Sequence, residues 1–192
     1  MLISGMTNSG KTHYVLDLLE SQYKNKFDYV FIVCPTFHYN KTYLERKFIY
    51  DDQDVVPLIL GDKLNEVLEE LFNRYKDQSE QTLIIIDDCA NLYDAKLKAT
   101  ALTKLAFHGR HANISTWILT QKYNAIVKDF RENISMLVLF YDKDKESREA
   151  AFNENDIGLS REEKDKIVKK LKTCKGAKLV VKLTQPFEFY IL

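Results

Sequence analysis

Apolar runs alternate with amphipathic stretches from residue 1 to residue 141. Apolar side chains recur at helical spacing in two stretches, around residues 64–75 and around residues 97–105. Strands that alternate with helices in this way favour a mostly parallel central sheet flanked by helices on both faces, an α/β fold. The runs that we expect to be strands are Leu2–Ser4, Tyr29–Cys34, Val55–Leu60, Leu83–Asp87, Thr116–Thr120 and Met136–Tyr141.

The pattern changes after Tyr141. Residues 142–175 are highly charged and are expected to be helical, and residues 178–183 and 187–192 then predict a C-terminal antiparallel hairpin around Gln185-Pro186. Because there is no internal repeat and no low-complexity linker, we expect a single domain over residues 1–192. Within it, residues 1–141 would form the core and residues 142–192 a charged helical segment with the closing hairpin.

Length and composition disfavour a membrane protein and a disulfide-rich protein, but they do not distinguish among other globular proteins. The 192 residues suffice for one α/β domain, and no apolar run approaches the roughly 20 residues of a membrane span. Nothing at the start resembles a signal peptide. The formal net charge is zero, so nucleic-acid contacts would have to be local. Cys34, Cys89 and Cys174 are far apart and odd in number, which favours reduced, intracellular thiols over a disulfide framework.

The first chemical signature follows the first strand. Residues 5–12 read Gly-Met-Thr-Asn-Ser-Gly-Lys-Thr and match the complete phosphate-binding pattern G-x-x-x-x-G-K-[ST], with a helical stripe after it. Glycines let such a loop turn its N–H groups toward a triphosphate, and the helix adds its positive end. Lys11 would reach the β- and γ-phosphates, and the Thr12 hydroxyl would bind Mg²⁺. We therefore expect a P-loop NTPase whose nucleotide contacts are Gly5, Thr7, Asn8, Ser9, Gly10, Lys11 and Thr12.

The second signature is an apolar run that ends in two carboxylates, Leu83-Ile84-Ile85-Ile86-Asp87-Asp88. This is the Walker B pattern, a buried strand whose carboxyl end lies where ligands bind in open α/β sheets. Asp87 would hold Mg²⁺, and Asp88 would orient and polarise the attacking water. The alternative for Asp88 is a cap on the next helix. Many P-loop ATPases of the additional-strand class carry Glu here, one methylene longer.

Three further polar residues surround the strand Thr116–Thr120. In the additional-strand class this strand lies between the P-loop and Walker B strands, so Gln121 at its tip would contact the γ-phosphate and water. Arg110 and Arg131 flank the strand, and either could stabilise charge on a transferring phosphoryl group, in trans if subunits form a ring. A solvated surface arginine is the alternative for each. We expect Arg131 ahead of Arg110.

Four segments together resemble the FtsK–HerA superfamily of DNA-pumping ATPases, and within it the poxvirus-type viral genome packaging ATPases. The segments are Ile3–Thr12, Ile84–Asp88, Gly109–Gln121 and Ile126–Asn133. The resemblance covers about residues 1–141 and implies a homo-oligomeric ring that hydrolyses ATP with Mg²⁺ and translocates double-stranded DNA into a preformed capsid. It also implies portal or vertex proteins of the capsid as partners, and a place in the host cytoplasm, a virus factory or the virion.

Two groups of basic residues are candidates for DNA contact, because phosphate contacts need positive charge and reach. Lys41, Arg46 and Lys47 follow the second strand, among Tyr39 and Tyr43. The second group is interleaved with acidic residues and reads more readily as a solvated helix face; it comprises Lys164, Lys166, Lys169, Lys170, Lys172, Lys175 and Lys178.

Two other functions fit a P-loop. A nucleoside or nucleotide kinase has a similar size, but an Arg-rich lid segment is missing. A regulatory GTP-binding switch would carry Asn-Lys-x-Asp, to which Tyr141-Asp142-Lys143-Asp144 is the nearest approach. A zinc site is disfavoured because the chain has no Cys-x-x-Cys to supply converging ligands.

Overall fold

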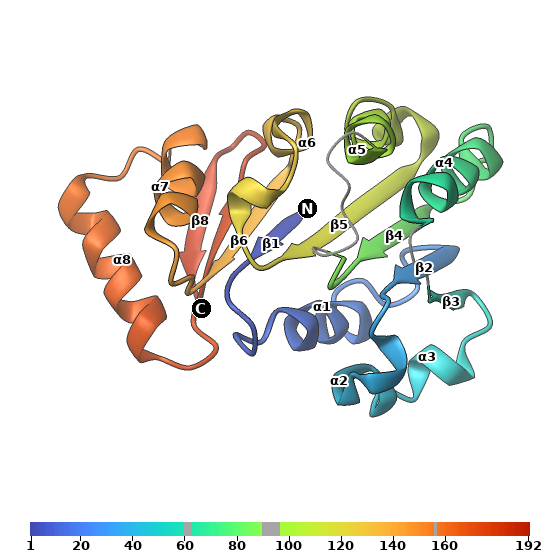
Figure 1. Cartoon of the computed structure of the whole chain (residues 1–192), viewed down its shortest axis with the longest axis horizontal. Helices are drawn as coiled ribbons and strands as arrows, with labels where there is room; N and C mark the ends of the chain where they lie inside the picture. Colours follow the sequence, from blue (N-terminus) through green and yellow to red (C-terminus); the bar gives the residue numbers. More distant parts are fainter. Residues whose placement is uncertain (60–62, 90–96, 156) are drawn as a thin grey trace. The chain divides into compact units, whose positions relative to one another are not determined.

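The structure is a computed structural model that describes residues 1–59, 63–89, 97–155 and 157–192. The chain forms two compact units, which Figure 1 colours along the sequence. Residues 12–119 form one, here called the central unit, and residues 1–11 with 120–192 form the other, the terminal unit. The strand after residue 175 pairs with the strand before residue 141, so both sides of the expected boundary at residue 141 lie in the terminal unit.

The central unit is built on four parallel strands in the order β3-β2-β4-β5. β4 is buried along its whole length, which explains why its sequence is a continuous apolar run and not an alternating one. The bounds are Tyr29–Val33 for β2, Val55–Leu58 for β3, Thr82–Ile86 for β4 and Ile114–Thr120 for β5.

Helices cover both faces of these strands. Figure 1 shows α4 and α5 on one side, and α1, α2 and α3 on the other. Tyr75 of α4 packs on Phe31 of β2 at a ring separation of 5.3 Å, and Tyr23, after α1, meets Trp117 of β5 edge-on at 4.9 Å. The bounds are Lys11–Glu20 (α1), Lys41–Leu44 (α2), Phe48–Asp51 (α3), Leu64–Tyr75 (α4) and Leu97–His108 (α5), with short 3-10 turns at Phe37–Tyr39 (η1) and Gly109–Ala112 (η3).

The terminal unit has the strand order β1-β6-β7-β8. β1 pairs parallel with β6, whereas β6–β7 and β7–β8 are antiparallel, so the predicted C-terminal hairpin is confirmed. The charged stretch 142–175 forms two helices, each started by a side-chain cap from Asp144 or Ser160. The bounds are Leu2–Ser4 (β1), Met136–Phe140 (β6), Lys178–Lys182 (β7), Glu188–Ile191 (β8), Tyr123–Ala125 (η4), Lys128–Glu132 (α6), Lys145–Glu154 (α7) and Arg161–Thr173 (α8).

Candidate nucleotide site

The backbone of the loop after β1 adopts conformations that favour Gly and Asn at particular positions. Asn8 and Gly10 lie in the left-handed region, with φ of 62° and 101°, where Gly and Asn are the favoured residues. Gly5 packs so tightly that an added Cβ would lie 2.5 Å from the Cβ of Phe140. The Gly5 N–H donates to the carbonyl of Thr120 at 3.2 Å. The P-loop pattern is thus accounted for by local conformation and by close packing.

Lys11 extends its side chain along this loop. Its ammonium donates to the carbonyl of Gly5 at 2.7 Å and to the carbonyl of Met6 at 3.0 Å, and the residue is buried. A buried positive charge inside a glycine-containing turn is suited to bind an anion that arrives beside it.

The predicted pair of metal ligands meets in the central unit. Asp87 follows β4 and is only 5% exposed. Its Oδ2 accepts a hydrogen bond from the Thr12 hydroxyl at 2.8 Å, across 75 positions of sequence. A hydroxyl and a carboxylate are both oxygen ligands of the kind that Mg²⁺ prefers. The donor set therefore fits Mg²⁺.

Tyr43, which lies in sequence among the candidate DNA-contacting residues Lys41, Arg46 and Lys47, also reaches Asp87. Its hydroxyl donates to the same Oδ2 at 2.7 Å, and the residue is fully buried. Burial and the negative charge of Asp87 raise the pKa of Tyr43 well above its usual value, so the phenol stays protonated and acts as a donor.

Asp88 is exposed, in contrast to Asp87. Its backbone lies in the left-handed region, at φ 54°, and its Oδ2 accepts a hydrogen bond from the Thr36 hydroxyl at 2.8 Å. Residues 90–96, where a helix capped by Asp88 would begin, lie outside the described residues. Next to the carboxylates, burial and the charge of Asp87 raise the pKa of the Cys34 thiol to about 12, so it is no nucleophile at neutral pH.

Gln121 is exposed and follows Thr120, the residue whose carbonyl accepts the Gly5 N–H in the terminal unit. The structure thus brings the expected sensor to within one residue of the P-loop backbone. This placement agrees with the predicted role of Gln121, which remains a prediction.

The two arginines differ in surroundings. Arg131 bonds both carboxylate oxygens of Glu154 at 2.6 Å, lies 5.0 Å from the ring centre of Tyr123, and has a side chain only 11% exposed. Arg110, in η3, is exposed and has no ion pair with any residue of the described ranges. A residue that acts on a neighbouring subunit must be able to reach it, which the exposed Arg110 can do more readily than Arg131; which arginine acts stays a prediction.

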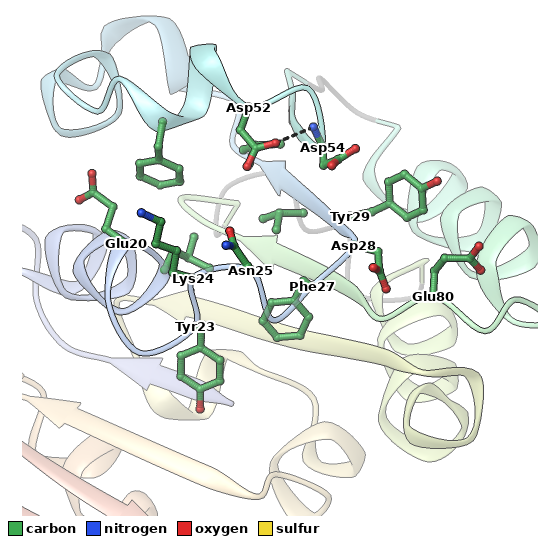
Figure 2. A pocket seen from close by; sticks show the side chains of 14 residues that line it. Glu20, Tyr23, Lys24, Asn25, Phe27, Asp28, Tyr29, Asp52, Asp54 and Glu80 are labelled. Atoms are coloured by element: carbon green, nitrogen blue, oxygen red, sulfur yellow. Dashed lines mark hydrogen bonds between the residues drawn. The ribbon is translucent and has the colours of Figure 1, made fainter.

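A pocket of about 660 Å³ in the central unit is not part of this arrangement (Figure 2). It lies beside the residues that begin β2 and β3 and contains none of the motif residues. Its lining is rich in carboxylates, which would repel a triphosphate: Glu20, Asp28, Asp52, Asp54 and Glu80.

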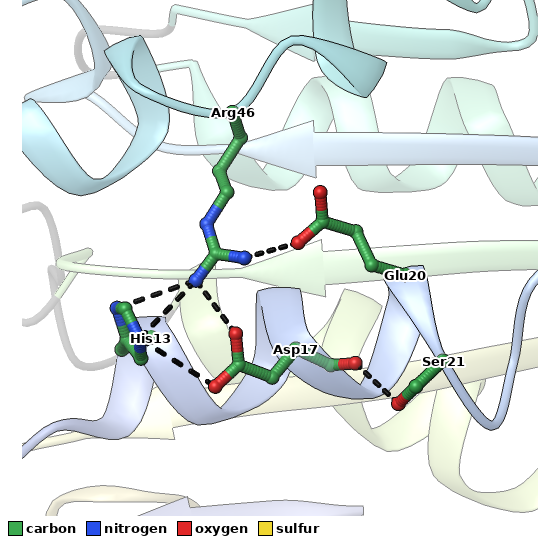
Figure 3. Close-up of polar contacts among 5 residues, drawn as sticks. All are labelled: His13, Asp17, Glu20, Ser21 and Arg46. Atoms are coloured by element: carbon green, nitrogen blue, oxygen red, sulfur yellow. Dashed lines mark hydrogen bonds and ion pairs between the residues drawn. The ribbon is translucent and has the colours of Figure 1, made fainter.

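Arg46, one of the candidate DNA contacts, is paired with carboxylates of the same chain. Arg46 donates to Asp17 at 2.7 Å and also pairs with Glu20, both on α1, and it lies 3.3 Å from the ring nitrogens of His13 (Figure 3). Arg46 thus ties the segment around α2 to the helix that follows the P-loop. It is a structural contact, which makes it a poor candidate for binding DNA.

The second basic group is less interleaved in space than its sequence suggests. Its acidic neighbours occupy the first turns of α8, where Glu163 completes the capping box with Ser160 and Glu162 pairs with Lys166 at 2.7 Å. The lysines beyond them are exposed and pair with no carboxylate of the described residues; they are Lys169, Lys170, Lys172 and Lys175.

Neither a cluster of metal-binding side chains nor a membrane span is found in the described part of the chain. Its residues contain no group of three or more His, Cys, Asp or Glu side chains that could hold a metal ion. None of its helices is both long enough and apolar enough to cross a membrane.

Comparison with known proteins gives the family. The model of the poxvirus A32 protein family matches residues 1–183, so the chain belongs to that family. The expected resemblance to poxvirus-type packaging ATPases is thereby confirmed. No curated protein matches the chain.

Solved structures show the same fold at low sequence identity. The DNA-packaging ATPase B204 from Sulfolobus Turreted Icosahedral Virus is 18% identical, with a TM-score of 0.67 over 99% of this chain and 94% of that one. B204 of Sulfolobus turreted icosahedral virus 2 in complex with AMPPCP gives the same values. The cytoplasmic domain of the Thermomonospora curvata Type VII secretion ATPase EccC is 14% identical, with a TM-score of 0.68 over 98% of this chain and 24% of that one. The predicted α/β P-loop fold is confirmed.

Proposed function

We propose that this chain is an ATPase that drives double-stranded viral DNA into a preformed capsid, where capsids assemble in the host cytoplasm or virus factory. The observation that carries the ATPase part of the proposal is the contact between Thr12 of the P-loop motif and Asp87 of the Walker B motif. Membership of the poxvirus A32 family and the fold shared with the packaging ATPase B204 support the coupling to DNA.

Each motif residue has a distinct part in this reaction. Lys11 neutralises charge on the β- and γ-phosphates, and Thr12 and Asp87 are the residues that would hold Mg²⁺. Mg²⁺, when bound, supplies positive charge to the phosphate oxygens. Asp88 is exposed, so its carboxylate is accessible to an attacking water, and we propose Gln121, which is also exposed, as the residue that senses the γ-phosphate.

Substitutions of Lys11 and Asp88 test the roles proposed for these two residues. Lys11→Ala should abolish ATP binding and hydrolysis while the unfolding midpoint stays close to that of the wild type. Asp88→Asn should still bind ATP but hydrolyse it about 10²-fold more slowly, the scale of losing a positioned general base. ATP turnover near the wild-type rate in Lys11→Ala would contradict the assignment of the site.

We further propose that the protein works as a homo-oligomeric ring in which Arg110 acts on the nucleotide of the neighbouring subunit. Arg110 is exposed on η3, and Phe107, three residues earlier, is 50% exposed and could join a subunit contact. Lys11→Ala subunits have defective sites but intact arginines, and Arg110→Ala subunits have the reverse. Mixed rings should regain hydrolysis that neither variant shows alone, whereas mixed rings without recovery would rule out action in trans.

For DNA, we propose the lysines at and just after the C-terminal end of α8 as phosphate contacts. Replacing Lys169, Lys170, Lys172 and Lys175 by Gln should weaken duplex binding and flatten its salt dependence by about one unit of slope for each phosphate that a lysine no longer neutralises. A control replaces Lys24 and Lys26, exposed lysines of the central unit, by Gln and is compared with the double variant Lys169→Gln, Lys170→Gln. An unchanged salt slope in the α8 variant would place the DNA elsewhere. Portal or vertex proteins of the capsid are the other partners that we propose.

A further inference from the structure

The chain that follows β2 contacts both Walker B carboxylates, a role that no motif assigns to it. Residues 34–43, here called the β2–α2 segment, supply two hydroxyl donors: Thr36 to Asp88 at 2.8 Å and Tyr43 to Asp87 at 2.7 Å. All four residues belong to the central unit. Two separate hydroxyls from one short segment therefore bond two adjacent carboxylates.

Tyr43 is closely packed where it meets Asp87. Its ring is fully buried and stacks on Phe37 at 5.1 Å, with 29° between the ring planes. Asn40 caps α2 through the N–H of Thr42 at 3.1 Å, and Arg46 ties the end of the same turn to α1. A donor on a closely packed ring restricts the orientation of the carboxylate that accepts its hydrogen bond.

Tyr43 and Thr12 both bond Oδ2 of Asp87. Neither hydroxyl bonds Oδ1, so the two donors define which edge of the carboxylate faces the P-loop threonine. Partners of this kind, which orient a metal ligand without touching the metal, commonly alter metal affinity or activity by roughly 10- to 100-fold.

Thr36 fixes the second carboxylate in a comparable way. The turn is closed by the Phe37 N–H, which donates to the Cys34 carbonyl at 3.2 Å. The Cys34 thiol lies 3.5 Å from the Thr36 hydroxyl. Since that hydroxyl gives its proton to Asp88, the thiol is left as the donor to the hydroxyl oxygen, and the chain of hydrogen bonds runs from Cys34 through Thr36 to Asp88.

The hydrogen bond from Thr36 matters for Asp88 because the Asp88 side chain is exposed and little else restrains it. Without such a bond, a solvent-facing carboxylate would sample several rotamers and lose orientation toward a water. The Thr36 bond occupies Oδ2, and among the described residues nothing else bonds the Asp88 side chain, so Oδ1 stays accessible. A base held by one oxygen and accessible at the other is the arrangement that activates a nucleophile.

We propose that Thr36 and Tyr43 are positioning residues for ATP hydrolysis: Thr36 orients Asp88 toward the attacking water, and Tyr43 orients Asp87 toward the metal. This inference rests on the proposed roles of the two aspartates. It adds the hydroxyls of Thr36 and Tyr43 to the machinery of the site.

The Thr36 part is tested by steady-state hydrolysis of ATP by the full chain. Thr36→Val keeps the shape of the side chain and removes the donor, so kcat should fall about 10-fold or more while KM for ATP changes less than about 2-fold. Thr36→Ser restores the hydroxyl and should recover most of kcat. Thr42→Val is the matched control, since the Thr42 side chain hydrogen-bonds neither aspartate, and it should behave like the wild type.

A double-mutant cycle separates positioning from packing. If Thr36 acts through Asp88, adding Thr36→Val to Asp88→Asn should reduce kcat no further. Wild-type kcat in Thr36→Val, a faster rate, or equal losses in the Val and Ser variants would each overturn this part. Should Asp88→Asn itself hydrolyse normally, the proposed role of Asp88 fails as well, whereas an inactive Asp88→Asn beside an active Thr36→Val refutes the positioning role alone.

The Tyr43 part is tested by titration with Mg²⁺. Tyr43→Phe keeps the ring against Phe37, and the Mg²⁺ concentration for half-maximal hydrolysis should rise about 10-fold. Tyr50→Phe, which removes the hydroxyl of a 55% exposed ring in the neighbouring helix α3, is the matched control. An unchanged Mg²⁺ dependence in a folded Tyr43→Phe protein would overturn this part, whatever the outcome for Thr36.

Discussion

Gly5 is where the packing of the P-loop can be tested most sharply. Gly5→Ala would place a Cβ 2.5 Å from the Cβ and 3.3 Å from the Cα of Phe140. Phe140 ends β6, which pairs with β1 on one side and β7 on the other, so its backbone cannot move aside easily. Overpacking of this kind costs about 1–3 kcal/mol, and we expect the upper half of that range.

Urea unfolding, followed by circular dichroism, measures this loss against a control. Gly176→Ala also adds a methyl group at a positive φ, 79°, but meets no atom within 4 Å. Its cost is therefore that of the backbone alone, about 1–2 kcal/mol for a side chain in the left-handed region. We expect Gly5→Ala to lower the free energy of unfolding clearly more than Gly176→Ala does. Equal losses, or a smaller loss for Gly5→Ala, would refute the packing argument.

Three further outcomes are expected. Ser147→Ala should destabilise the protein by about 1–3 kcal/mol in the same unfolding assay, because the buried Tyr123 N–H, which donates to Ser147 at 2.8 Å, would lose its acceptor; a loss under about 0.5 kcal/mol would contradict this. Ser160→Ala, which breaks the capping box of α8, should cost about 0.5–2 kcal/mol, and no loss would show that the cap is replaced by water. Native protein should react with a thiol reagent at the exposed Cys174 only, and all three thiols should react in urea; fast reaction of either buried thiol in the native state would contradict its burial.

The parts of the fold that could be predicted are those whose determinants lie close together in the sequence. The run Leu83–Ile86 indicated a fully buried strand, and β4 is one; helical spacing over residues 64–75 predicted α4 with the same bounds. The P-loop could be recognised because its constraints, left-handed residues and a closely packed glycine, are carried by residues adjacent in sequence.

The contacts that sequence analysis missed are long-range. Thr36 and Tyr43 lie 52 and 44 positions from the aspartates that they bond, with no periodicity or motif to link them. The basic and aromatic residues of the segment after β2 suggested that it binds DNA, and they gave no sign of contacts with the aspartates. The pairing of Arg131 with Glu154 was missed for a similar reason, since it depends on how α6 meets α7 in the fold.

The rate of ATP hydrolysis with and without duplex DNA tests the central claim most directly. A DNA-packaging ATPase should hydrolyse ATP faster when double-stranded DNA is added, and Lys11→Ala should remove both the basal and the stimulated rate. A protein that consumes ATP only when a nucleoside or nucleotide acceptor is supplied, and whose rate duplex DNA leaves unchanged, would be a kinase and would contradict the account.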